Sequence, residues 1–164
     1  MEKIPSLDFL EQQISEQKKK HLVSQPDVVE ETARRKIDMP LRRLRYNASH
    51  GIFKKPVRIG REVFYEADYI YPAITCNYLL KIQFGLSLRK IKKIMSANGS
   101  SMKTLLDRIQ IFLGKYGTED KRPGYYYLIE QKFVEALAGP SSAVDLDKIE
   151  KEAKDGYDKS GKGK

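Results

Sequence analysis

The chain has 164 residues, a formal net charge of +9 and 40% hydrophobic residues, which fits one basic domain, or one domain with appendages. No apolar run approaches the roughly 20 residues of a membrane-spanning helix, and residues 1–22 lack the apolar core of a secretory signal. With one cysteine, Cys76, and two histidines, there is no metal-ligand pattern, and no nucleophile-base pair or phosphate-cradling loop stands out. We therefore expect a cytoplasmic protein that is not an enzyme and that uses no cofactor, metal or membrane.

The positive charge is concentrated in one part of the chain. Residues 34–61 hold 10 Lys and Arg against 1 acid, whereas residues 1–33 hold 4 bases and 7 acids. A shorter basic stretch, 81–93, holds 5 bases and no acid. Such concentration is typical of proteins that bind polyanions, and the alternative is a solvated basic face.

Hydrophobic spacing predicts three helices before residue 50. Residues 1–24 are expected to contain an amphipathic helix at 5–22, and a second helix is expected at about 27–37. Pro40 is expected to open a third helix that extends to Ser49, with arginines on its outer arc. Two short helices joined by a tight turn form a helix-turn-helix pattern. The expected inward side chains of the third helix are Leu41, Leu44 and Ala48.

A hairpin and two further helices are predicted next. Gly60-Arg61 lies between β-forming residues, and a glycine in the first central position suits a type II′ turn. Helices are expected at 69–83, with Cys76 as a buried small hydrophobe, and at 88–95 after Ser87. The expected hairpin residues are Val57, Ile59, Val63 and Tyr65, and the expected inward helical residues are Ile70, Ile74, Tyr78, Ile82, Leu88, Ile91, Ile94 and Met95.

The remaining chain is predicted to hold two amphipathic helices and a tail. The helices are expected at 101–116 and 124–137, within a helical region 101–138 whose apolar faces form a core or a homodimer interface. Residues 139–164 are expected to be a polar, disordered tail, with a short helix in its Lys- and acid-rich part as the alternative.

Three segments carry a family resemblance. They are LRRLRYNASHGIF (41–53), RIGREVFYEADYI (58–70) and FGLSLRKIKKIM (84–95). In this order and at these separations they resemble the DNA-binding domain of the MerR family of regulators over about residues 28–95. The chain departs from the family pattern at Asn47, where a second aromatic is usual, and at 97–100, which interrupt the position of the long dimerisation helix.

The resemblance implies a mainly α protein with a winged helix-turn-helix domain at 25–96, a small β-hairpin wing and additional amphipathic helices. It implies a dimeric, sequence-specific protein of the bacterial nucleoid that binds double-stranded DNA and regulates transcription. Two alternatives are a phage or mobile-element accessory protein of excisionase or packaging type, and a MerR-like protein-interaction module.

The expected DNA contacts lie on the third helix and the wing. Arg42 and Arg43, near the helix start, are placed to read base edges. By resemblance, Arg45 and Tyr46 contact the DNA backbone. Tyr65 is expected either to pack at the base of the wing or to reach the backbone. The remaining candidates are Ser49 on the helix and Lys54, Lys55, Arg58 and Arg61 in and before the wing.

Overall fold

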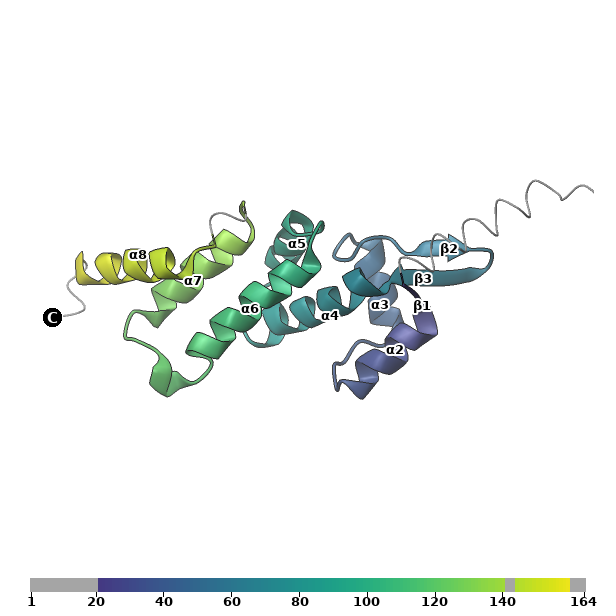
Figure 1. The fold of residues 1–164 in the computed structure, drawn as a ribbon, viewed down its shortest axis with the longest axis horizontal. Coiled ribbons are helices and arrows are strands. Elements are labelled where there is room, and N and C mark those ends of the chain that lie inside the picture. Colours follow the sequence, from purple (N-terminus) through teal and green to yellow (C-terminus); the bar gives the residue numbers. More distant parts are fainter. Residues whose placement is uncertain (1–20, 141–143, 160–164) are drawn as a thin grey trace, which may run out of the picture. The chain divides into compact units, whose positions relative to one another are not determined.

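The computed structural model describes residues 21–140 and 144–159. It is mainly helical with a small three-stranded antiparallel sheet (Figure 1), which confirms the expected fold class at this level. The chain divides between Thr75 and Cys76 into two compact units. These are the N-terminal unit (1–75) and the C-terminal unit (76–164).

The N-terminal unit combines the sheet with helices. Its elements are β1 (Leu22–Ser24), α2 (Gln25–Arg34), α3 (Leu41–Ser49), β2 (Val57–Ile59), β3 (Glu62–Glu66) and the first turns of α4 (Ala67–Ile82). The strand order is β1-β3-β2, with β3 antiparallel to both neighbours.

Helix α2 begins and ends through local backbone chemistry. The Ser24 hydroxyl accepts a hydrogen bond from the Asp27 N–H (3.3 Å), which caps the first turn two residues before the expected start. At the other end Lys36 adopts a φ of +62°, and the N–H of Ile37 donates to the Thr32 carbonyl (3.1 Å). Such a left-handed residue ends a helix. The helix therefore stops at Arg34 and not at the expected residue 37.

Strand β1 was not expected. Leu22, which we expected to end the N-terminal helix, lies in this strand. It pairs with Glu66 of β3, and its neighbour Val23 pairs with Tyr65. The rest of the expected helix, residues 5–20, lies outside the described residues.

The predicted hairpin is confirmed. Ile59 pairs with Glu62, which leaves a two-residue loop of Gly60 and Arg61. Gly60 has a φ of +62° and Arg61 does not have a positive φ. A positive φ at the first central position alone is the signature of a type II′ turn.

The third helix is confirmed at 41–49, and so is most of its inward face. Leu44 and Ala48 are buried in the core of the N-terminal unit with Val28 and Ile70. Leu41 was expected inward but is 37% exposed. As the first residue of α3 it has no preceding turn to cover it, and helical side chains lean toward the N-terminus.

The C-terminal unit consists of helices joined by loops, with no strand among its described residues. It holds the end of α4, α5 (Leu88–Ala97), α6 (Met102–Tyr116), the 3₁₀ turn η1 (Glu119–Lys121), α7 (Tyr126–Leu137) and α8 (Leu146–Lys159). The predicted apolar faces of α6 and α7 pack against each other, with the rings of Phe112 and Phe133 stacked at 4.2 Å between centroids.

Two expected core residues of the C-terminal unit are exposed. Ile82 and Leu88 are the last residue of α4 and the first residue of α5, and they are 55% and 52% exposed. The chain turns between them at Gly85, whose φ is +61°. The apolar periodicity of the sequence therefore continues to helix ends that no longer face the core. Leu80 is buried in place of Ile82.

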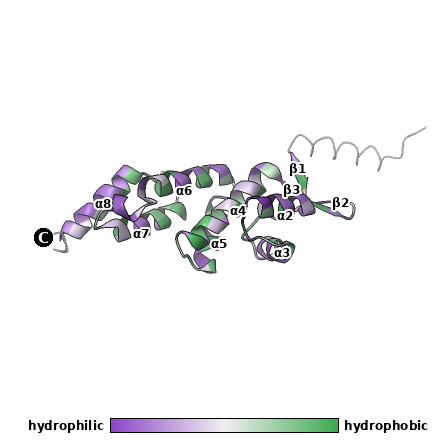
Figure 2. Cartoon of the chain, turned by 90° about the horizontal axis from the view of Figure 1, so that it is seen from below, coloured by the Kyte–Doolittle hydropathy of each residue, from purple (hydrophilic) through white to green (hydrophobic). Residues whose placement is uncertain are grey.

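The expectation of a disordered tail at 139–164 is wrong for residues 146–159, which form α8. Figure 2 shows this helix as mainly hydrophilic. Its narrow apolar stripe, Ile149 and Ala153 at i and i+4, is buried in the C-terminal unit. The Glu150 carboxylate also accepts hydrogen bonds from the Tyr116 hydroxyl (2.5 Å) and Lys115 Nζ (2.7 Å). Residues 141–143 and 160–164 lie outside the described part.

Candidate nucleic-acid interface

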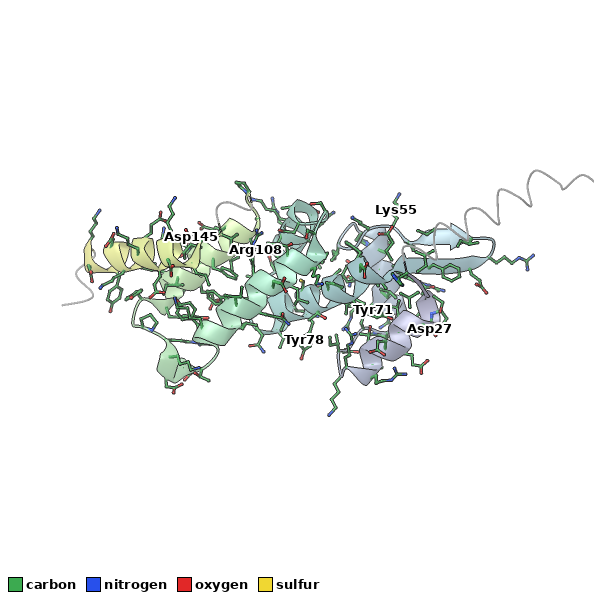
Figure 3. All side chains as sticks on the ribbon, viewed as in Figure 1. Asp27, Lys55, Tyr71, Tyr78, Arg108 and Asp145 are labelled. Carbon is green, nitrogen blue, oxygen red and sulfur yellow. The ribbon has the colours of Figure 1, made fainter. Side chains whose placement is uncertain are left out.

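A groove of about 540 Å³ lies between α3 and the hairpin in the N-terminal unit. The groove is lined by Gln25, the first residue of α2, by one face of α3, by the segment before β2 and by the hairpin itself. The lining residues are Gln25, Arg45, Ala48, Ser49, Lys55, Pro56, Arg58, Arg61, Val63 and Tyr65. The Lys55 side chain is labelled in Figure 3, where it projects away from the ribbon.

The charged side chains that line the groove are all basic, and no Asp or Glu is among the lining residues. Its basic side chains are Arg45, Lys55, Arg58 and Arg61, and none of them forms an ion pair with another described residue. Strand alternation explains the separation of charge: Val63 and Tyr65 face the groove, so Glu62 and Glu66 of β3 point to the opposite face. The groove is therefore a concave positive surface with room for an anion.

One face of α3 continues the positive surface. Arg45 and Ser49 line the groove, and Arg42 lies one turn before Arg45 on the same face, exposed to solvent. Tyr46 lies beside this face, where its ring stacks on His50 at 3.8 Å between centroids. The Ser49 hydroxyl donates to the Tyr46 carbonyl (3.0 Å), which satisfies a carbonyl at the end of the helix.

Tyr65 packs at the base of the hairpin, which is one of the two roles that the sequence left open. Its side chain is buried, 3% exposed, yet it also lines the groove. Gln25 Nε2 donates to its hydroxyl oxygen (3.3 Å), and no described residue accepts the hydroxyl hydrogen. Burial raises the pKa of Tyr65, against smaller lowering effects of the Gln25 hydrogen bond and the Arg45 charge. At neutral pH Tyr65 is therefore a neutral hydrogen-bond donor among the residues that line the groove.

Arg43, expected to read base edges, is engaged elsewhere. Its Nη1 donates to both the carboxylate and the carbonyl oxygen of Asp38, each at 3.0 Å. Asp38 lies in the turn between α2 and α3, so this contact ties the start of α3 to the turn. Arg43 does not line the groove.

Lys54 is also outside the groove. Its backbone N–H donates to the Tyr69 hydroxyl (2.8 Å), and its Nζ lies 4.9 Å from the centroid of the Tyr69 ring. A cation held over an aromatic face contributes to stability at exposed sites. Lys54 therefore fastens the chain before β2 to the start of α4.

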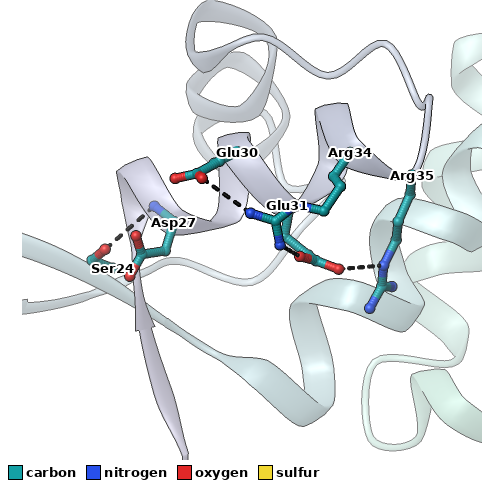
Figure 4. A network of polar contacts seen from close by, with 6 residues as sticks. All are labelled: Ser24, Asp27, Glu30, Glu31, Arg34 and Arg35. Carbon is teal, nitrogen blue, oxygen red and sulfur yellow. Dashed lines mark hydrogen bonds and ion pairs between the residues drawn. The ribbon is translucent and has the colours of Figure 1, made fainter.

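Two further bases of the 34–61 stretch, at the end of α2 and just after it, form ion pairs with acids of α2 (Figure 4). Arg34 pairs with Glu30 at 3.0 Å and with Glu31 at 2.6 Å, and Arg35 pairs with Glu31 at 3.1 Å. These acids lie just before the basic stretch, so a count that starts at residue 34 misses them. The Arg35 guanidinium also lies 4.9 Å from the centroid of the Tyr71 ring.

The structure thus divides the ten predicted contact residues. Six line one groove, and they are Arg45, Ser49, Lys55, Arg58, Arg61 and Tyr65. Arg42 and Tyr46 lie on the exposed part of α3 next to it, and Arg43 and Lys54 are held in other contacts. Gln25 was missed, because its role depends on β1 pairing with β3, and a three-residue strand leaves no periodic signal in the sequence.

Other chemistry is sparse in the described ranges. Cys76 is fully buried as expected, and burial raises the pKa of its thiol to about 12, with the Asp107 charge adding to the shift. Residues 21–140 and 144–159 contain no cluster of His, Cys, Asp and Glu side chains that could hold a metal ion. Among these same residues, no helix is both long and apolar enough to cross a bilayer. Comparisons with protein-family models, with curated proteins and with solved structures found no match to this chain.

Proposed function

We propose that the N-terminal unit binds double-stranded DNA as a winged helix-turn-helix of the MerR type, and that the protein is a dimeric, sequence-specific transcriptional regulator. In this proposal α2 and α3 are the helix-turn-helix and the β2–β3 hairpin is the wing. The observation that carries it is the groove between α3 and the hairpin, whose four bases face no carboxylate.

The groove suits a DNA phosphate backbone. Bases that are unpaired in the free protein bind phosphates without first breaking an ion pair, and each phosphate that they neutralise releases condensed counterions. Arg58 and Arg61 of the hairpin would hold one side of the backbone and Arg45 of α3 the other. The Tyr65 hydroxyl, oriented by Gln25, would donate to a phosphate oxygen.

In this proposal the exposed face of α3 contacts the edges of the DNA base pairs. Arg42 is exposed near the helix start, one turn from the phosphate-binding Arg45. An α-helix fits the major groove of B-DNA, and an arginine there can bond bidentately to the O6 and N7 of guanine. Arg43 is a weaker candidate than the sequence suggested, because reading a base would require it to leave Asp38.

Binding to a selected duplex and to a scrambled duplex of equal length tests the proposal. Arg42→Ala should lower affinity for the selected duplex by roughly 1–3 kcal/mol and narrow the difference between the two duplexes. Arg58→Ala should weaken both duplexes alike. Leu44→Ala serves as the stability control, since it removes a core side chain and should cost roughly 2–5 kcal/mol of folding free energy.

Two outcomes would contradict the proposal. Undetectable binding of the wild-type chain to any duplex at low salt would exclude DNA as the partner. Equal losses on both duplexes from Arg42→Ala and Arg58→Ala would reduce α3 to a phosphate clamp, and would favour a nonspecific architectural protein.

A further inference from the structure

A second groove, of about 290 Å³, lies between α5 and α7 within the C-terminal unit. The residues on its α7 side lie three or four positions apart and form one continuous stripe of that helix. The residues on its other side begin with Leu86, just before α5. The lining residues are Leu86, Lys90, Lys93 and Ile94 on one side, and Tyr127, Glu130, Gln131, Val134, Glu135 and Ala138 on the other.

The two walls of this groove carry opposite charge. Lys90 and Lys93 come from α5, and Glu130 and Glu135 come from α7. No ion pair crosses the groove between described residues, although Glu130 shares a hydrogen bond with Tyr126 on its own helix. The floor is apolar, and Tyr127, 74% exposed, stands on the α7 wall.

The C-terminal ends of the two helices are tied together. Asn98, which ends α5, donates from Nδ2 to the carbonyl of Leu137, the last residue of α7 (2.7 Å). The positive and negative walls therefore form one fixed surface.

This surface complements a second copy of itself. In an isologous contact, each patch on one copy meets the partner patch on the other. A twofold axis parallel to the groove brings the lysine wall of each copy opposite the glutamate wall of the other, so that both pairs of walls attract. The main apolar faces of α6 and α7 are not available for such a contact, because Ile109, Phe112 and Phe133 are already buried within the chain.

We propose that the groove between α5 and α7 is a homodimer interface, in which Lys90 and Lys93 of each copy face Glu130 and Glu135 of the other. This deepens the proposed function, because a dimer is what lets a winged helix read two half-sites. Helices of 10 and 12 residues are about 15 and 18 Å long, so the contact belongs to the small class of interfaces, below roughly 1,200 Å². The expected dimer is accordingly reversible and concentration dependent.

Sedimentation equilibrium of the full chain without DNA tests the interface separately from DNA binding. The wild type should shift from monomer to dimer between low micromolar concentration and about 200 µM. The double variants K90E/K93E and E130K/E135K should each weaken dimerisation at least about tenfold, because like charges then face each other. An equimolar mixture of the two variants should form a heterodimer, since an all-acidic groove then meets an all-basic one.

A matched control reverses two exposed lysines of α8 at the same spacing. K151E/K154E makes the same change of net charge as K90E/K93E, but outside the groove, and should leave the dimer unchanged. Circular dichroism melts establish that all variants remain folded. A wild-type chain that stays monomeric to about 200 µM overturns the proposal. A dimer that ignores both reversals, or a mixture that fails to associate, overturns it as well.

Discussion

The two units of this protein treat charged side chains differently. In the N-terminal unit, four bases line a groove with no carboxylate opposite them. In the C-terminal unit, Glu150 accepts hydrogen bonds from Lys115 and Tyr116 and so fastens α8 to α6. Basic side chains thus form an unpaired positive surface in one unit and hold a helix in place in the other.

The comparison also applies within the basic stretch. Arg34, Arg35 and Arg43 belong to it by sequence, but each is bound to a carboxylate. Arg58 and Arg61 belong to the same stretch, but neither forms an ion pair with a carboxylate of the described residues. Ion-pair partners, and not the density of charge along the chain, separate the bases that stabilise the fold from those that the proposed function assigns to DNA.

The largest expected effect concerns the apolar core of the C-terminal unit. Phe133→Ala should destabilise the protein by about 3–5 kcal/mol, because the Phe133 ring is fully buried and stacks on Phe112. Ile111→Ala, on α6 but 61% exposed, should change stability by less than about 0.5 kcal/mol. Chemical denaturation of both variants makes the comparison, and similar losses would mean that this ring pair does not form the core.

A smaller effect is expected where α8 is attached. Glu150→Gln should cost about 1–2 kcal/mol, because the amide oxygen that replaces the carboxylate carries no charge and accepts weaker hydrogen bonds from Lys115 and Tyr116 at this partly exposed site. The hydrogen bonds from Lys115 and Tyr116 hold the pKa of Glu150 below its ordinary value. Its stabilisation is therefore present above the ordinary glutamate pKa and is lost as the pH falls through the lowered value.

Thermal melts over a pH series check this attachment. The difference between the wild type and Glu150→Gln should be constant near neutral pH and shrink below about pH 4. Glu152→Gln is the control, since that carboxylate is half exposed and lies 3.9 Å from Lys132. A gap that persists at low pH would show that the loss does not come from the charge of Glu150.

The smallest of the stability effects concerns the turn of the hairpin. Gly60→Ala should cost roughly 1 kcal/mol, because the φ of +62° is strained for any residue with a Cβ atom. A Cβ there meets nothing within 4 Å, so the cost is conformational and not a steric clash. Arg61→Ala, at the next position of the same turn, should leave the melting temperature nearly unchanged. Equal melting temperatures for Gly60→Ala and the wild type would contradict the turn assignment.

Local signals in the sequence were sufficient for much of the fold. Helix α3 follows Pro40, α5 follows the capping hydroxyl of Ser87, and the hairpin turns at Gly60, each through chemistry confined to a few neighbouring residues. A short helix in the polar tail was only an alternative to disorder, and the packing of α8 was not predicted, because two apolar residues, Ile149 and Ala153, are a weak periodic signal in a polar segment. Its burial depends on partners far away in the sequence.

The candidate site was predictable as a region but not residue by residue. Charge density pointed to residues 34–61, and six of the predicted contacts line the groove. The sequence does not show that Asp38 binds Arg43 or that Tyr69 holds Lys54, because these contacts depend on side-chain geometry. Gln25 enters the groove only through the pairing of β1 with β3.

The salt dependence of duplex binding tests the central claim most directly. With each of the four groove bases engaging one phosphate, a plot of log K against log salt should have a slope of about −3.6. R58Q/R61Q should make this slope shallower by about 1.8, since two phosphate contacts are lost. R34Q/R35Q removes the same charge from ion-paired positions and should leave the slope unchanged. Equal changes of slope in the two double variants would contradict the account, because binding would then follow net charge and not the groove.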